Sequence, residues 1–196
     1  AVERLRAGRA AGAADLVPSL CEPVPVRVLL ALLGLPEELS GPLTEQAVVL
    51  GRRDPDRAVA VADDLLDRLL PVIRARRAAP PTDDLLSVLA HGTVEDRPLT
   101  DVEVFSHVRL LAIAGTDTVT RALGNVLCAL LSHPDRFEVV RREPARVGAA
   151  VEEALRWECP ATSVPRIALA DLELGGVAVP AGAAVRVGLG AANRDP

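Results

Sequence analysis

The periodicity of apolar residues changes once along this chain, close to Pro160. Before that point apolar residues recur every three or four positions, which indicates amphipathic helices. After it, short runs bounded by glycine and proline indicate strands. We therefore predict a mainly α fold with a small β-sheet. The expected helices cover residues 1–11, 15–33 (in two pieces), 37–50, 54–77, 82–91, 100–131, 135–142 and 146–157, and the expected strands cover 166–170, 172–174, 177–179 and 183–189.

Capping and turn residues support these limits. Asp15 can cap the second helix, and Gly34 can end it. Thr100 and Glu103 fit a capping box at the start of the longest helix. Gly175-Gly176 predicts a hairpin turn, and Pro180-Ala181-Gly182 predicts a second turn.

Composition excludes several classes of function. The net charge of −5 argues against a general nucleic-acid surface. Arginines interrupt the apolar runs, at Arg27 and Arg109, so we expect no membrane span. The three cysteines have neither metal-ligand nor CxxC spacing, and an odd count suits the cytoplasm. We expect Cys21 and Cys128 to pack as small core residues.

The centre of the longest predicted helix contains Ala114-Gly115-Thr116-Asp117-Thr118, which is poor helix sequence. The Thr118 hydroxyl lies four residues after Ala114 and can bond the Ala114 carbonyl, an arrangement that bends helices. An acid beside a hydroxyl at such a bend indicates a reactive site. The alternative is a close helix crossing that Gly115 permits, and the motif alone leaves both open.

A second set of residues precedes and follows Pro160. Glu153 and Arg156 are three residues apart on one helix, so they share a face, and their apolar neighbours suggest partial burial. On spacing alone such a pair is usually a solvated surface bridge. Arg166 opens the first strand and could hold a carboxylate through a paired fork, or be an ordinary strand-edge arginine.

Taken in order, these segments resemble the cytochrome P450 family. The motifs are Ala-Gly-Thr-Asp-Thr, Glu-Glu-Ala-Leu-Arg-Trp, Pro-Arg, Leu-Gly-Gly, Pro-Ala-Gly and Ala-Asn-Arg-Asp-Pro. Each motif is weak alone, whereas the ordered set is specific. The resemblance implies a partial P450 fold, with 1–196 as one partial domain. Its parts would be mid-chain helices over 1–99, a long distal helix over 100–133, the Glu-x-x-Arg region over 134–160 and a small β-hairpin region over 161–196.

The resemblance also implies roles for single residues. Ala114 and Gly115 match the oxygen-binding groove above haem b, and Arg166 matches the arginine that binds a haem propionate. Asp117 and Thr118 match the acid–alcohol pair that delivers protons during dioxygen activation. Glu153 and Arg156 match a structural pair. The substrate-contact segment matches Ala161, Thr162, Ser163 and Val164.

The family holds the haem iron through one cysteine in a glycine-rich loop beyond the Asn-Arg-Asp-Pro segment, and the sequence stops at Pro196. Cys159 lacks such a loop, so we expect no metal ligand in this chain and doubtful haem retention. Both ends of the sequence look cut, which predicts a fragment of a larger protein.

Two functions follow from the resemblance. The first is a haem-thiolate monooxygenase that hydroxylates a small apolar substrate, with electrons from a ferredoxin or flavoprotein. The second is a haem-free helper that activates a partner enzyme. The intact Asp117-Thr118 pair favours the enzyme, because a helper needs no proton delivery.

Overall fold

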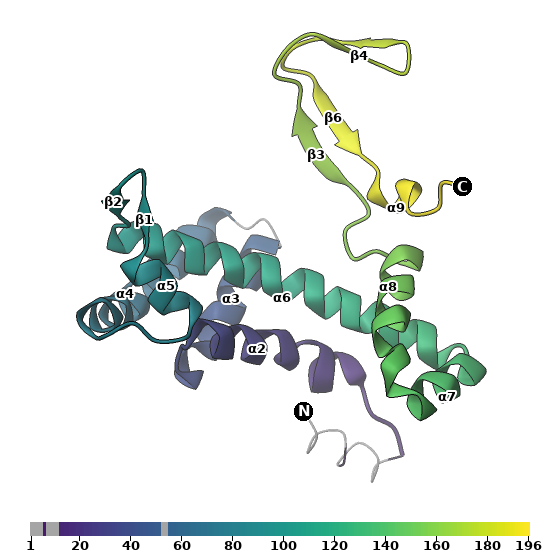
Figure 1. Ribbon diagram of the computed structural model, residues 1–196, viewed down its shortest axis with the longest axis horizontal. Helices are drawn as coiled ribbons and strands as arrows, with labels where there is room; N and C mark the ends of the chain where they lie inside the picture. Colours follow the sequence, from purple (N-terminus) through teal and green to yellow (C-terminus); the bar gives the residue numbers. More distant parts are fainter. Residues whose placement is uncertain (1–5, 7–11, 52–54) are drawn as a thin grey trace. The chain divides into compact units, whose positions relative to one another are not determined.

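The computed structural model describes residues 6, 12–51 and 55–196, which form two compact units, Ala1–Thr120 and Arg121–Pro196. Helix α6 runs through the boundary between them (Figure 1). Each unit is described by itself below. The helix predicted over residues 1–11 and the helix start predicted at Asp54 lie outside the described residues.

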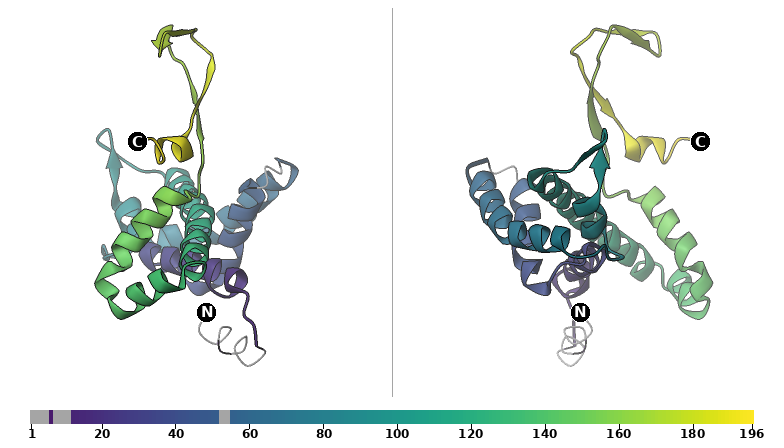
Figure 2. Two further views of the ribbon diagram at one scale, coloured as in Figure 1. Left: turned by 90° about the vertical axis from the view of Figure 1, so that its right-hand side faces the viewer. Right: turned by 60° about the vertical axis from the view of Figure 1, so that its left-hand side comes forward.

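The first unit is helical, as the apolar periodicity predicts. Helices α3 and α4, drawn in blue in Figure 2, make the most extensive helix–helix contact of the unit. The elements are η1 (Val17–Cys21), α2 (Pro23–Leu33), η2 (Glu37–Leu39), α3 (Ser40–Gly51), α4 (Pro55–Ala78), α5 (Leu85–His91), β1 (Thr93–Val94), β2 (Arg97–Pro98) and the first part of α6 (Asp101–Leu131).

The capping signals lie where the sequence places them. Asp15 Oδ1 accepts the amide of Val17 at 3.0 Å, at the start of η1. Gly34 ends α2 in the left-handed conformation, with φ of 62°. The Thr100–Glu103 box closes in both directions, with bonds of 2.8 and 3.2 Å. Local hydrogen bonding therefore explains why these helices begin and end there.

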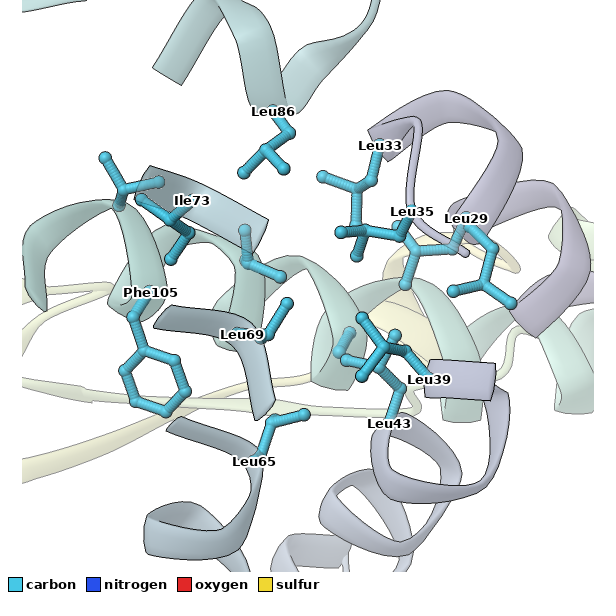
Figure 3. Close-up of a cluster of buried hydrophobic side chains, with 14 of the residues drawn as sticks. Leu29, Leu33, Leu35, Leu39, Leu43, Leu65, Leu69, Ile73, Leu86 and Phe105 are labelled. Carbon is cyan, nitrogen blue, oxygen red and sulfur yellow. The ribbon is translucent and has the colours of Figure 1, made fainter. Parts of the chain in front are cut away.

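The core of the first unit is aliphatic (Figure 3). It consists mainly of leucines from α2, α3, α4 and α5, which pack against one stripe of α6. Phe105 is its aromatic member. The stripe of α6 repeats every three or four residues and comprises Val104, Phe105, Val108, Ala112 and Thr116. This burial orients α6, because the opposite side of the helix is left exposed.

Arg76 joins three helices of this unit. Its guanidinium donates to the Gly34 carbonyl at 2.9 Å and to the side chains of Thr82 and Asp84. Asp84 in turn caps α5 by accepting the Ser87 amide at 2.8 Å. Burial alone raises the pKa of the Asp84 carboxyl, but the bonds from Thr82, Ser87 and Arg76 outweigh it, so this pKa lies below its ordinary value. Arg76 thus ties the ends of α2 and α4 to the start of α5.

The sequence predicts a loop between the helices expected over 82–91 and 100–131, but a short hairpin, β1–β2, lies there. Val94 pairs with Arg97, and the turn residues Glu95 and Asp96 have φ of 49° and 61°. The sequence lacks the Asn-Gly or Asp-Gly signal of such a turn, because two acidic residues occupy the left-handed positions. That is why the prediction of a loop is wrong here.

The second unit combines helices with two antiparallel ladders. After the end of α6 it contains α7 (Pro134–Arg142), η3 (Pro144–Arg146), α8 (Val147–Trp157), β3 (Val164–Ile167), β4 (Leu172–Leu174), β5 (Val177–Val179), β6 (Ala184–Val187) and α9 (Leu189–Ala192). Strand β3 pairs with β6, and β4 pairs with β5 across Gly175 and Gly176, whose φ of 58° and 81° confirm the predicted turn.

Two strands, β3 and β6, have limits that differ from the prediction. Strand β3 begins at Val164 and ends at Ile167, and the strand expected to reach Leu189 ends at Val187. The Gly182 amide bonds the Ala168 carbonyl at 2.8 Å, which turns the chain there instead of extending it. Leu189 begins the short helix α9, whose Gly190 amide bonds the Thr162 carbonyl at 3.0 Å. Tertiary bonds therefore decide these ends.

No helix within the described part of the chain has the length and apolar character needed to cross a lipid bilayer.

Replacing Arg76 by alanine is expected to destabilise the protein by about 2–4 kcal/mol, because the largely buried Asp84 carboxylate loses its cationic partner and the Gly34 carbonyl loses a side-chain donor. Thermal denaturation measures the effect. Arg68→Ala is the matched control, because Arg68 lies on the same helix but pairs with Asp64 at a half-exposed position. Equal loss of thermal stability in the two variants would contradict the role given to Arg76.

Candidate functional site

Helix α6 carries the first group of candidate residues. The Thr118 hydroxyl donates to the Ala114 carbonyl at 2.5 Å, which confirms the bond expected from the spacing. The helix nevertheless continues without interruption from Asp101 to Leu131. The poor helix residues are therefore accommodated by side-chain bonds to the backbone, and the bend itself stays a prediction.

The two threonines of the motif have different environments. Thr116 is 7% exposed and bonds the Ala112 carbonyl, so it belongs to the core stripe of α6. Thr118, like Ala114 and Asp117, is exposed. An exposed hydroxyl is available to a ligand, whereas the buried one is not. The structure thus separates a structural threonine from a candidate catalytic one, which the motif alone does not.

Gly115 tests the alternative of a close helix crossing. A Cβ built on Gly115 would meet no described atom within 4 Å. A glycine required by a close crossing would show a neighbouring backbone at that distance. The described residues therefore form no close helix crossing at Gly115, and the open space beside Gly115 is compatible with a bound group.

The second group lies on α8, where Arg156 holds Glu153 through two bonds. Arg156 Nε donates to one carboxylate oxygen at 2.7 Å, and Nη2 donates to the other at 2.8 Å. This fork lowers the pKa of Glu153 and raises that of Arg156. The two side chains are 62% and 45% exposed, so the prediction of partial burial is wrong. The reason is that α8 buries Ala154 alone, on its other face.

Arg156 also reaches the C-terminal segment. Its Nη1 donates to the Asn193 carbonyl at 3.0 Å, and the Asn193 side chain donates to the Leu155 carbonyl at 3.3 Å. Arg194 bonds the Trp157 carbonyl at 2.7 Å and lies over the indole ring, 5.4 Å from its centroid. The Ala-Asn-Arg-Asp-Pro motif therefore closes onto the end of α8. Sequence reasoning used this motif as a family marker and missed these contacts.

Residues 158–163 connect α8 to β3, and we call them the α8–β3 connection. Its first residue, Glu158, accepts a bond from the Asn125 side chain of α6, at 2.7 Å from Nδ2 to the carbonyl oxygen. Cys159 Sγ donates to the Ala161 carbonyl at 3.4 Å. The candidate substrate residues Ala161, Thr162 and Ser163 thus lie in a connection held at its start by Asn125 and near its end by the Gly190 amide, and Val164 begins β3 opposite Val187.

Arg166 follows two residues later on β3 and is exposed. Its Nη1 donates to the Pro165 carbonyl at 2.8 Å. Within the part of the chain that the structure describes, no carboxylate lies in ion-pair contact with this guanidinium. Arg166 therefore retains donors for an external carboxylate, which fits the propionate role that the resemblance implies.

A pocket of about 400 Å³ opens beside the α8–β3 connection. Cys159 and Thr162 line it from the connection, and α9 and the end of α8 supply the remaining walls: Trp157, Glu158, Gly188, Gly190, Ala191 and Arg194. The charged groups of its wall, Glu158 and Arg194, lie 3.6 Å apart as an ion pair. The pocket is therefore an open hollow, bordered by residues that also hold the C-terminal segment.

The cysteines and histidines form no metal cluster among the described residues. Cys21 is buried as predicted, whereas Cys128 is exposed, so the core role predicted for Cys128 is wrong. The reason is that the second unit buries little around that part of α6. His91, His107 and His133 each place Nδ1 within 2.9 Å of the carbonyl four residues earlier, so each ring is hydrogen-bonded to nearby backbone.

A model of the cytochrome P450 family matches residues 50–196. The chain belongs to the cytochrome P450 family. It is 35% identical to 6-deoxyerythronolide B hydroxylase of Saccharopolyspora erythraea and 36% identical to vitamin D(3) 25-hydroxylase of Pseudonocardia autotrophica, over 94% of this chain and 46% of each relative. The crystal structure of CYP109E1 from Bacillus megaterium with testosterone is similar, with a TM-score of 0.83 at 31% identity.

That match covers 92% of this chain and 50% of the CYP109E1 chain. The chain therefore spans about half the length of the P450 relatives that it matches. The helical units and their small ladders are part of the cytochrome P450 fold, which confirms the predicted fold class. Members of the family use haem b, as the resemblance implied.

Replacing Arg156 by alanine in this P450 chain is expected to release residues 189–195, because the bond to the Asn193 carbonyl is lost together with the fork to Glu153. Amide hydrogen exchange measured by mass spectrometry should rise in that segment. Arg146→Ala is the control, since Arg146 forms an ion pair of the same spacing with Glu143, through one bond from Nε, and, as far as the structure describes it, no bond to the C-terminal segment. Equal exchange in both variants would show that the Arg156 contact is dispensable.

Proposed function

We propose that this chain is part of a haem-thiolate monooxygenase that hydroxylates a small apolar organic substrate. The observation that carries the proposal is the exposed Thr118 hydroxyl, bonded to Ala114 beside an open Gly115 on an otherwise core-packed helix. Family membership adds the reaction class, and the relatives reported above are named as hydroxylases. Those names favour the enzyme over the haem-free helper.

Haem b is the cofactor that we assign, and the residues present fit it. Ala114 is exposed and a Cβ on Gly115 would meet no described atom within 4 Å, so there is open space beside both residues, and Arg166 offers donors to a propionate. When bound, haem supplies the iron that activates dioxygen for insertion of one oxygen atom into the substrate. We assign the iron ligand to none of the three cysteines of this chain.

Asp117 and Thr118 are the residues to which we assign proton delivery. Thr118 Oγ1 donates its hydrogen to the Ala114 carbonyl, so its lone pairs can accept a hydrogen bond from a water molecule and hold that water in place as a proton donor. Asp117 adjoins it as an exposed carboxylate that can be recharged from solvent. The pair can therefore relay a proton from solvent to a group bound beside Gly115.

The remaining assignments concern the surroundings of the site. Ala161, Thr162, Ser163 and Val164 contact substrate, and Glu153 with Arg156 stabilises the fold. The electron donor is a ferredoxin or flavoprotein, and the location is the cytoplasm, which suits three free thiols. Both units belong to one domain, and the family match from residue 50 to 196 supports this because it crosses their boundary.

The proposed function is tested with the full-length protein. The reduced protein treated with carbon monoxide is expected to give the difference spectrum of a thiolate-ligated haem. The 196-residue chain alone is expected to lack this spectrum. Absence of haem in the full-length protein would overturn the proposal of a monooxygenase and favour the haem-free helper.

Thr118→Ala in the full-length protein is expected to uncouple electron use from product formation, since the proton-holding hydroxyl is gone. The measurement is the ratio of product formed to reduced nicotinamide consumed, with a fall of about tenfold or more expected for loss of a positioned proton donor. Thr118→Ser keeps the hydroxyl and is expected to retain most of the coupling. Unchanged coupling in Thr118→Ala would remove Thr118 from the mechanism.

A further inference from the structure

We propose that Asn125 is a positioning residue that fixes the α8–β3 connection, and with it the substrate-contact residues, against helix α6. The inference rests on the proposed function for its meaning, because that function gives Ala161–Val164 their contact with substrate. Its physical content is one hydrogen bond, from Asn125 Nδ2 to the Glu158 carbonyl at 2.7 Å.

Asn125 lies on the same side of α6 as Ala114 and Thr118. An α-helix turns about 100° per residue, so residues four and eleven positions after Ala114 lie within about 40° of it around the axis. These residues are Thr118 and Asn125. The stripe that carries the candidate oxygen groove and the proton-holding hydroxyl therefore also carries the amide that holds the start of the connection.

The acceptor of the Asn125 bond is a carbonyl at the end of a helix. Glu158 is the C-cap residue of α8, so its carbonyl lies beyond the last carbonyls that bond within the helix. A carbonyl at a helix end needs a partner from elsewhere, and an asparagine amide supplies it. Asparagine is also a poor residue for a helix interior, because its side chain competes with the backbone. Helix formation therefore does not explain Asn125, whereas the bond to Glu158 does.

The α8–β3 connection is also held at its other end. Four residues after Glu158, the Thr162 carbonyl accepts the Gly190 amide at 3.0 Å, and Val164 enters the ladder with Val187. The connection is thus fixed at its end by the ladder and α9, and at its start by Asn125. Loss of the bond at its start leaves residues 159–163 with freedom to shift, which changes the shape that a substrate meets.

The experiment uses the full-length protein and three variants. Asn125→Asp keeps the shape of the side chain and replaces the donor by an acceptor. Asn125→Gln keeps an amide donor on a longer side chain. Asn193→Asp is the matched control, because that asparagine donates to a carbonyl of the same helix, Leu155, outside the connection.

The first readout is amide hydrogen exchange in peptides that cover residues 158–166. Asn125→Asp is expected to speed exchange there by about three- to tenfold, the range that the loss of one hydrogen bond supports. Asn125→Gln is expected to restore part of the protection, and Asn193→Asp is expected to leave this segment unchanged. Unchanged exchange in Asn125→Asp, or an equal increase in Asn193→Asp, would overturn the positioning role.

The second readout uses imidazole and 4-phenylimidazole as probes that ligate haem iron and differ in bulk. Their dissociation constants come from the red shift of the main haem absorption band. Asn125→Asp is expected to change the ratio of the two constants by about threefold or more, matching the exchange effect, while Asn193→Asp keeps the ratio. A constant ratio in Asn125→Asp would contradict the link to the substrate space.

Failure of the proposed function is recognised separately. It appears as absence of haem in the unaltered protein, whereas the exchange measurement needs no haem. Faster exchange in Asn125→Asp, with no haem in the unaltered protein, would support the positioning role and reject the monooxygenase. Haem in the unaltered protein, with unchanged exchange in Asn125→Asp, would support the monooxygenase and reject the positioning role.

Discussion

Helix α6 is packed on one side and open on the other, and this asymmetry governs what the chain can do. Val104, Val108, Ala112 and Thr116 face an aliphatic core, which fixes the rotation of the helix about its own axis. The opposite stripe then has to present Ala114 and Thr118 outward. Hydrophobic burial of a few side chains thus determines which hydroxyl of the motif is available for chemistry.

Local signals made much of the fold predictable. The Asp15 cap, the Thr100–Glu103 box, the left-handed Gly34 and the Gly175-Gly176 turn each involve residues close together in sequence, so composition and spacing suffice to find them. The bond from Thr118 to Ala114 is of the same kind, because both partners lie on one helical turn. The family motifs identified the remaining candidate residues without stating what those residues touch.

The features that escaped prediction depend on partners far along the chain. The difference between Thr116 and Thr118 follows from which side of α6 meets the core. The exposure of Cys128 and of the Glu153–Arg156 fork follows from how little the second unit buries. The Asn125 contact spans 33 residues, and nothing local at position 125 indicates its acceptor. The β1–β2 hairpin is local, and it escaped prediction because its turn uses non-glycine residues at positive φ.

The bond between Thr118 and Ala114 also sets an energetic cost for donation of the hydroxyl hydrogen to another group. While the hydroxyl points at the carbonyl, its oxygen can only receive, so the residue rests in a receptive state. To give a proton outward the O–H must rotate away, and this costs about 1 kcal/mol, the net worth of one such bond. The helix backbone therefore holds the hydroxyl weakly. A bound molecule that offers a better acceptor can draw the O–H away from the Ala114 carbonyl.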